Sequence, residues 1–417
     1  MRLTKTLTAL LLALALVLGL SACHKENQPD GPSDLPGETV SPSPSAQPEV
    51  DLLPDNAIDV TQTLYGFPED TPMLTVNGQT VSAEAYLYWL GNMAAYYDSL
   101  FYQYYYQNLD FTMEVSEGKT WDDQIKEIAY QNSVLLAITP SIAQELNVSL
   151  TDAELQEVYD QRAEDLESTG RDAYADRLQA LGINDRTDLE LRRVSRLFQK
   201  IEDVYENDLL TGSGPDAITD QTVDEYVEQN DLLRAKHILI LTKDMETGAD
   251  LSEEEQAAAR EKIDGLAAQL AASDDPAALF DTLMNENSQD SGLSTNPDGY
   301  LFTAGDMVSE FEEGTRALEF GGISPVIQST YGYHIILRLD PDCAQTRQTI
   351  AQEKFNDLAQ SYVDSAQVTL APEYEDISAA DYYQKLLAFQ DTLEPEESAS
   401  PTLEPYDGDA STPVPES

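Results

Sequence analysis

The chain has 417 residues and carries 77 acidic against 23 basic side chains, which gives a formal net charge of −54 at pH 7. A surface this acidic repels nucleic acids and anionic lipid headgroups, so both are poor candidates for binding partners. The only two cysteines are Cys23 and Cys343, so the folded body has to be stabilised by hydrophobic cores rather than by a disulfide framework, and the chain is long enough for two such cores.

The N-terminal segment has the pattern of an export signal. Arg2 and Lys5 precede an almost unbroken run of leucine and alanine, which is short for a membrane span and ends in small residues. Leu20-Ser21-Ala22-Cys23 resembles a bacterial lipobox, in which the cysteine is lipidated and becomes the mature N-terminus. We therefore expect a signal peptide over residues 1–22 and a lipid on Cys23, with an uncleaved anchor or a chance cysteine as the weaker alternatives.

Two segments are predicted to be disordered. Residues 23–70 are rich in proline, serine and acidic residues, which cannot bury a core, and such a linker holds a folded body clear of the lipid. Residues 391–417 combine acidic residues and prolines with no basic residue, and we expect them to form a disordered acidic tail.

A mainly helical domain is expected over residues 71–230. Asn77-Gly78 separates two alternating runs and predicts a hairpin. Helices are predicted over residues 82–107 and 121–146, and sequences of capping-box form at Thr151 and Thr187 predict helices from Asp152 and Asp188. A break at residues 211–215 precedes a short helix over residues 220–228.

The first of these helices is rich in aromatic side chains. They are candidates for a surface that cradles unfolded polypeptides, although packing against neighbouring helices is the better expectation for any single one. The set is Tyr86, Trp89, Tyr96, Tyr97, Phe101, Tyr104 and Tyr105.

A second domain is predicted over residues 231–341. It begins and ends with a short apolar strand, and each strand has one histidine near its middle, His237 or His334. Because side chains alternate between the two faces of a strand, His237 shares a face with Ala235, and His334 with Ile336. Helices are predicted over residues 253–272 and 276–285, and a capping box at Ser309 predicts a third with Phe311 in its first turn.

The motifs between these strands resemble, in their order, the parvulin family of peptidyl-prolyl cis/trans isomerases. The resemblance implies a small antiparallel sheet flanked by helices. It implies that Met307 and Phe311 line a proline pocket that Phe302 supports. It also implies that the catalytic residues are His237, His334, Asp290 and Ser329. The two histidines would form a central pair with linked tautomers. The motifs are His237-Ile238-Leu239, Asn285-Glu286-Asn287-Ser288-Gln289-Asp290-Ser291, Gly305-Asp306-Met307-Val308-Ser309-Glu310-Phe311 and Gly332-Tyr333-His334-Ile335-Ile336.

Each of these residues also has a simpler explanation when it is taken alone. A strand histidine is usually a satisfied polar residue, and a methionine or phenylalanine near a helix start is usually core. No third ligand cluster accompanies the histidines, so we expect neither a metal nor a cofactor, and Cys343 has no histidine near it in sequence. The motifs occur together and in the order of the parvulin family, and this favours an isomerase active site over the simpler explanations.

The chain departs from the family pattern in two places. The usual Gly-Gly-Asp-Leu-Gly-x-Phe stretch reads Asn296-Pro297-Asp298-Gly299-Tyr300-Leu301-Phe302 here, which we expect to reshape the pocket wall near Gly299. The loop after Leu241 lacks the arginine cluster that would bind a phosphate group.

Residues 342–390 are predicted to be a C-terminal helical segment, with a helix over residues 345–367. The strand pair at Asn77-Gly78, the aromatic helix and the segment Leu146–Leu155 are similar to the PrsA/SurA type of exported foldase. This resemblance implies that the C-terminal segment packs on the N-terminal domain. The expected fold class is therefore α+β, with a parvulin domain inserted in a mainly helical, chaperone-like domain.

The function that these expectations imply is that of a lipid-anchored, extracytoplasmic prolyl isomerase and foldase. Its partners would be unfolded exported polypeptides with X-Pro bonds and the membrane that holds its lipid. A holdase chaperone with the same architecture and a vestigial isomerase is the alternative. A cell-surface adhesin or scaffold fits the acidic linker and tail but leaves the parvulin motifs unexplained.

Overall fold

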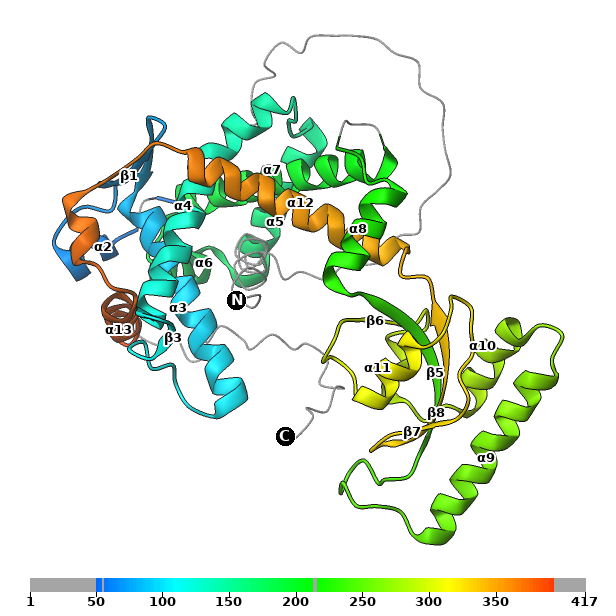
Figure 1. The fold of residues 1–417 in the computed structure, drawn as a ribbon. Helices are drawn as coiled ribbons and strands as arrows, with labels where there is room; N and C mark the ends of the chain where they lie inside the picture. The colour runs from blue at the N-terminus through cyan, green and yellow to red at the C-terminus, as the bar shows by residue number, and fades with distance from the viewer. Residues whose placement is uncertain (1–49, 55, 213–215, 394–417) are drawn as a thin grey trace. The chain divides into compact units, whose positions relative to one another are not determined.

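The computed structural model describes residues 50–54, 56–212 and 216–393, which form two compact units (Figure 1). The first unit comprises the described residues up to Tyr205 and those from Phe355 onward, and the second comprises Glu206–Lys354. The predicted signal peptide, Cys23, the linker up to residue 49 and the tail from residue 394 lie outside the described residues.

The first unit is mainly helical and contains a small sheet. Strand β1 (Pro72–Val76) lies between β2 (Gln79–Ser82) and β9 (Val368–Leu370), and both pairings are antiparallel. The turn between β1 and β2 is formed by Asn77 and Gly78, which both adopt positive φ values, of 50° and 85°, as the predicted hairpin requires. The helices of this unit are α2 (Val60–Tyr65), α3 (Ala83–Tyr105), α4 (Trp121–Glu145), α5 (Asp152–Thr169), α6 (Arg171–Ala180), the larger part of α7 (Asp185–Thr211) and α13 (Ala379–Gln390), with a short hairpin β3 (Glu114–Ser116) and β4 (Lys119–Thr120).

The C-terminal segment returns to the first unit, as the resemblance implied. Thr369 of β9 pairs with Thr75 of β1, and Tyr382 of α13 is buried in the core of this unit. The second unit is therefore an insertion, and the predicted α+β class is confirmed. The two boundaries fall inside α7 and α12 (Ala344–Ser365) rather than in the breaks at residues 230 and 341.

Two polar contacts join α8 (Asp220–Asn230) to the start of α12, and both elements belong to the second unit. The Arg347 guanidinium of α12 lies 2.7 Å from the Asp220 carboxylate, and the Tyr226 hydroxyl donates to Glu353 Oε1 at 2.9 Å. These long-range polar contacts join elements that the sequence pattern separates.

The predicted disorder is wrong for the end of the linker. Leu53 is buried, and its backbone N–H donates to Asp185 Oδ2 at 2.7 Å. Val60 of α2 is also buried in the core of the first unit. The local sequence has no apolar periodicity, and its contacts reach residues more than 100 positions later: the Leu53 N–H donates to Asp185, and the Tyr65 ring stacks on Tyr382.

Two predicted helix starts are also wrong. Helix α7 begins at Asp185, and the Thr187 N–H donates to Asn184 Oδ1 at 3.0 Å, so Thr187 lies inside the first turn. Helix α11 (Ser309–Arg316) has no side-chain cap at its N-cap residue, Val308. The residue that would complete a capping box, Glu312, instead accepts from two backbone N–H groups of the preceding loop.

The second unit is built on a four-stranded antiparallel sheet with the order β6 (Tyr300–Phe302), β5 (Leu233–Leu241), β8 (Gly332–Leu339) and β7 (Ile327–Gln328). Helices α9 (Glu253–Ala272) and α10 (Pro276–Asn287) cover one face, and α11 lies on the other (Figure 1). The first face is a dry core of apolar side chains, with Phe280 and Tyr333 as its buried aromatic residues. The second face carries both histidines.

Candidate active site

The strand register brings the two histidines of the second unit together. In the β5–β8 pairing, His237 lies opposite Ile336, and Leu239 lies opposite His334, so the histidines are diagonal neighbours on the face that α11 covers. Their rings are stacked, with centroids 5.3 Å apart and an interplanar angle of 11°. The two Nδ1 atoms are 3.1 Å apart, which is hydrogen-bonding distance.

A carboxylate and a hydroxyl group lie at the two ends of this pair. Asp290, which follows α10, has its Oδ2 atom 3.0 Å from His237 Nε2. Ser329, which follows β7, has its Oγ atom 2.7 Å from His334 Nε2 and accepts a hydrogen bond from the Tyr331 N–H at 3.1 Å. The structure thus brings together the four polar residues that were predicted from the sequence.

The protonation states determine which atom donates and which accepts in each hydrogen bond of this chain. Burial, and then the neighbouring His237, lower the pKa of His334 to about 3, so His334 is neutral at physiological pH. Burial raises the pKa of Asp290, but hydrogen bonds from His237, Tyr300 and Gly292 outweigh this effect and the net shift is downward. Asp290 is therefore an ionised acceptor.

An ionised Asp290 requires a proton on His237 Nε2, which leaves Nδ1 of a neutral His237 as an acceptor. The His334 Nδ1–H then donates to that atom, and the Ser329 hydroxyl donates to His334 Nε2. Every polar atom in the chain has a partner while both histidines are neutral. Protonating His237 at Nδ1 would place two donors against each other, and protonating His334 at Nε2 would force the Ser329 hydroxyl to turn from donor to acceptor.

An apolar cluster adjoins the histidines. The Phe311 ring presents an edge-on arrangement to both imidazoles, with centroids 5.1 Å from His237 and 5.7 Å from His334. Phe302 lies 5.6 Å from Phe311, and Met307 packs against the same cluster while remaining half-buried. The three predicted pocket residues therefore meet beside the polar chain.

Sequence reasoning missed Tyr300. Its hydroxyl donates to Asp290 Oδ2 at 2.5 Å, and its ring is edge-on to His237 with centroids 5.7 Å apart. In the family pattern quoted above, the corresponding position is a glycine, so the only signal was that this stretch departs from the pattern.

The other candidate sites are less complete. No group of three or more His, Cys, Asp or Glu side chains suited to a metal ion occurs within residues 50–54, 56–212 and 216–393. The Cys343 thiol is half-buried beside the Thr346 hydroxyl at 3.4 Å. Lys243, in the loop that lacks an arginine cluster, faces Asp250 at 3.9 Å.

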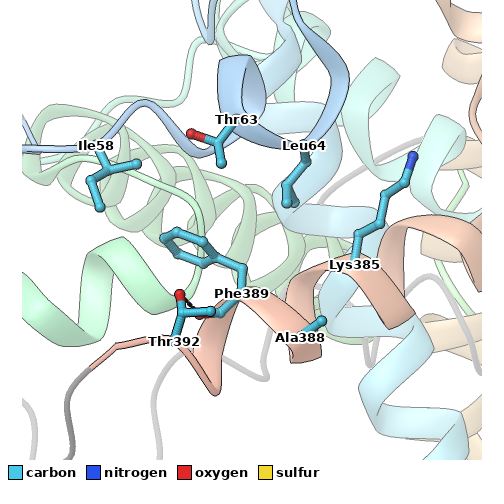
Figure 2. A pocket seen from close by; sticks show the side chains of 7 residues that line it. All are labelled: Ile58, Thr63, Leu64, Lys385, Ala388, Phe389 and Thr392. Carbon is cyan, nitrogen blue, oxygen red and sulfur yellow. Dashed lines mark hydrogen bonds between the residues drawn. The ribbon is translucent and has the colours of Figure 1, made fainter.

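The first unit has a largely apolar cavity of about 620 Å³ between α2 and α13 (Figure 2). Its only charged lining residue, Lys385, lies 2.7 Å from the Asp381 carboxylate and stacks over the Tyr65 ring. This cavity contains no set of groups for acid–base or nucleophilic chemistry. The lining residues are Ile58, Thr63, Leu64, Lys385, Ala388, Phe389 and Thr392.

Comparisons with known proteins agree with the geometry of the second unit. Residues 237–340 match the rotamase family, described as the PPIC-type PPIase domain. The chain is 32% identical over 151 residues to the chaperone SurA of Thiobacillus denitrificans, and the match covers 33% of this chain and 32% of that one. It is 27% identical over 229 residues to the foldase protein PrsA of Caldanaerobacter subterraneus subsp. tengcongensis, covering 53% of this chain and 58% of that one. The chain therefore spans less than two thirds of the length of these curated relatives.

Among solved structures, the crystal structure of PrsA from Bacillus subtilis is 15% identical and aligns over 71% of this chain and 99% of that one, with a TM-score of 0.24. A TM-score this low carries no argument about function. The family match rests on the second unit and on the sequences. Residues 237–340 are therefore a parvulin-type peptidyl-prolyl cis/trans isomerase domain, in a chain that is similar to the PrsA foldases and SurA chaperones.

Proposed function

We propose that the chain is an extracytoplasmic, membrane-anchored foldase that isomerises X-Pro bonds of exported polypeptides at the His237–His334 pair. The observation that carries this proposal is the fully hydrogen-bonded histidine chain beside the apolar cluster of Phe302, Met307 and Phe311. Polar groups and apolar side chains converge on one face of the sheet, where His334, Phe302 and Phe311 are buried and His237, Asp290 and Met307 remain partly exposed.

The proposed mechanism needs no covalent step. An X-Pro bond isomerises slowly because twisting it sacrifices amide resonance, with a barrier of about 18–20 kcal/mol. The planar amide is more dipolar than the twisted one, so an apolar surrounding that excludes water favours the twisted state. Met307 and Phe311 line the proline pocket, Phe302 supports it, and the histidine pair sets the polarity around the twisted bond.

Anchoring is proposed from the lipobox-like residues alone. Within the part of the chain that the structure describes, no helix is both long enough and apolar enough to cross a membrane. Cys23→Ala is expected to release the protein from membranes or to leave its precursor uncleaved. An unmodified Cys23, found by mass spectrometry in membrane-bound mature protein, would refute the lipid anchor.

A holdase is the second candidate function, and one observation favours it. At the C-terminal end of α3, Tyr102, Tyr104, Tyr105 and Tyr106 are 59%, 59%, 64% and 82% exposed. No charged residue occurs between Asp98 and Asp110, although the chain as a whole carries a charge of −54. Exposed aromatic side chains in a stretch of sequence without charged residues are suited to unfolded polypeptide segments, because they offer a large contact area at a low entropic cost. We name these four residues the tyrosine patch.

One experiment separates the two candidates. Met307→Ala removes half-buried apolar contact and is expected to slow proline-limited refolding of a client by up to about tenfold. The matched control is Met245→Ala, at a methionine of the same unit that is 60% exposed, which should leave the rate unchanged. Replacing Tyr104, Tyr105 and Tyr106 by serine should lower suppression of client aggregation and leave prolyl exchange intact. If the wild-type chain suppresses aggregation but does not accelerate prolyl exchange, the holdase is the function.

A further inference from the structure

The Asp290 carboxylate is held by donors from three directions. The Tyr300 hydroxyl of β6 and the His237 Nε2–H of β5 both reach Oδ2, at 2.5 and 3.0 Å, and the Gly292 N–H reaches Oδ1 at 3.1 Å. His334 lies behind His237, one hydrogen bond further from the carboxylate. Tyr300 supplies the shortest of these contacts, and the reaction described above assigns it no role.

The backbone makes room for this hydroxyl. A Cβ atom added at Gly292 would lie 2.2 Å from the Tyr300 oxygen, closer than any real contact, and 3.3 Å from the ring carbon that bears it. Because Gly292 has no Cβ atom, the Tyr300 hydroxyl can reach the Asp290 carboxylate while the Gly292 N–H donates to the same group.

We propose that Tyr300 is a positioning residue, which holds Asp290 as an acceptor and thereby selects the tautomers of His237 and His334. The inference rests on the proposed role of the histidine pair. It does not require Tyr300 to touch the substrate.

The direction of each hydrogen bond supports this role. Burial and the contact with Asp290 raise the pKa of Tyr300, so its hydroxyl remains a donor. With Tyr300 and Gly292 both donating, the carboxylate stays ionised and fixed in place, and only the Nε2–H tautomer of His237 satisfies it. That tautomer leaves His237 Nδ1 to accept from His334, whose Nε2 atom then accepts from Ser329. Without the hydroxyl, Asp290 loses one of two donors on Oδ2 and is freer to rotate away from His237.

The first test is Tyr300→Phe in the full chain, with prolyl exchange measured by NMR on an uncharged X-Pro peptide. A hydrogen bond to a charged group is strong enough for its loss to lower kcat/KM by roughly tenfold, and KM should be unchanged. Combining it with Asp290→Asn distinguishes positioning from direct contact. In the Asp290→Asn background the further loss should be less than about twofold, because the carboxylate that Tyr300 acts on is gone.

The second readout is spectroscopic and does not depend on activity. The chain has three histidines, so selective ¹⁵N-histidine labelling gives few imidazole signals. In the wild type we expect the signals of His237 and His334 to report single tautomers, protonated at Nε2 and Nδ1 respectively. Tyr300→Phe should show a mixture. If the wild type has no isomerase activity, the proposed function fails, and these spectra still decide the role of Tyr300.

Two further variants show whether an effect of Tyr300→Phe comes from the lost hydrogen bond or from misfolding. Gly292→Ala pushes the hydroxyl away but keeps the tyrosine, and it should reproduce both effects of Tyr300→Phe without adding to them in the double variant. Tyr226→Phe is the matched control, because it removes a hydroxyl that donates to a carboxylate elsewhere in the same unit, and it should change neither readout. The inference is overturned if Tyr300→Phe keeps wild-type tautomers and kcat/KM, or if its loss is equally large in the Asp290→Asn background.

Discussion

The two faces of the sheet in the second unit use burial in opposite ways. On one face, Ile238, Ile240 and Ile335 pack against α9 and α10 around Phe280. On the other, His334 is as deeply buried as these residues, but each of its ring nitrogens has a polar partner. The same two strands thus separate stability from chemistry, because alternate residues along them point to different faces.

The difference shows why the histidine face tolerates burial. A buried polar group without a partner costs about 1–3 kcal/mol in a protein, so one unpaired atom would offset much of the apolar packing by Phe311. The chain from Tyr331 to Asp290 has donors and acceptors in matching order, which removes that cost. We therefore expect substitutions on the dry face to act on stability and those on the histidine face to act on proton positions first.

The largest effect is expected from Phe280→Ala on the dry face. Phe280 is fully buried, and truncating it leaves a cavity that costs about 3–5 kcal/mol. Hydrogen exchange at the β5 and β8 amides measures this loss in the second unit alone. Fluorescence gives the internal control, because both tryptophans, Trp89 and Trp121, lie in the first unit and should report no change. A loss below about 1 kcal/mol would mean that this face does not supply the stability.

A smaller effect is expected from Ser329→Ala on the histidine face. The substitution removes the hydroxyl that donates to His334 Nε2 and leaves a buried acceptor unpaired, at a cost of about 1–3 kcal/mol. Amide exchange of β8 measures the cost, and the exposed Ser309→Ala is the control. Unchanged protection of β8 would show that the hydrogen-bonded chain adds nothing to stability.

The smallest effect is a dependence of stability on pH. The folded pKa of His334, about 3, lies below the value of about 6.5 for an unfolded histidine, so protons bind the unfolded state more tightly. The stabilisation is complete above pH 6.5 and is lost as the pH falls, by about 1 kcal/mol between pH 7 and pH 5.5. His334→Gln removes this titrating group. The free energy of unfolding, measured by β8 amide exchange, should then fall less steeply with decreasing pH, by the slope that corresponds to one bound proton. Equal slopes in the variant and the wild type would contradict a neutral His334.

The sequence predicted the histidine face better than the rest of the molecule. Period-two alternation placed His237 and His334 correctly, because a one-residue slip would have turned every side chain to the other face. The resemblance supplied Asp290 and Ser329, which lie in loops that no periodicity could have located. The role of each residue remains a prediction.

Two of the misses share a physical cause. Tyr300 and Leu53 make their hydrogen bonds to residues that are 10 and 132 positions away in sequence, and such contacts leave no local pattern. The capping-box form at Thr187 does not cap the helix, because Asn184, three residues earlier, accepts the Thr187 N–H at the helix start. Local propensity is a weak guide wherever one long-range hydrogen bond decides the outcome.

The most direct test of the account is prolyl exchange catalysed by the full chain with and without the Asp290 carboxylate. We expect the wild type to accelerate cis/trans exchange of an uncharged X-Pro peptide. Asp290→Ala should lower kcat/KM by at least about tenfold, because it removes the acceptor that orients the histidine pair, and β8 exchange should stay protected. Exchange that is as fast with Asp290→Ala as with the wild type, in a protein whose second unit remains folded, would contradict the claim that this polar chain carries the catalysis.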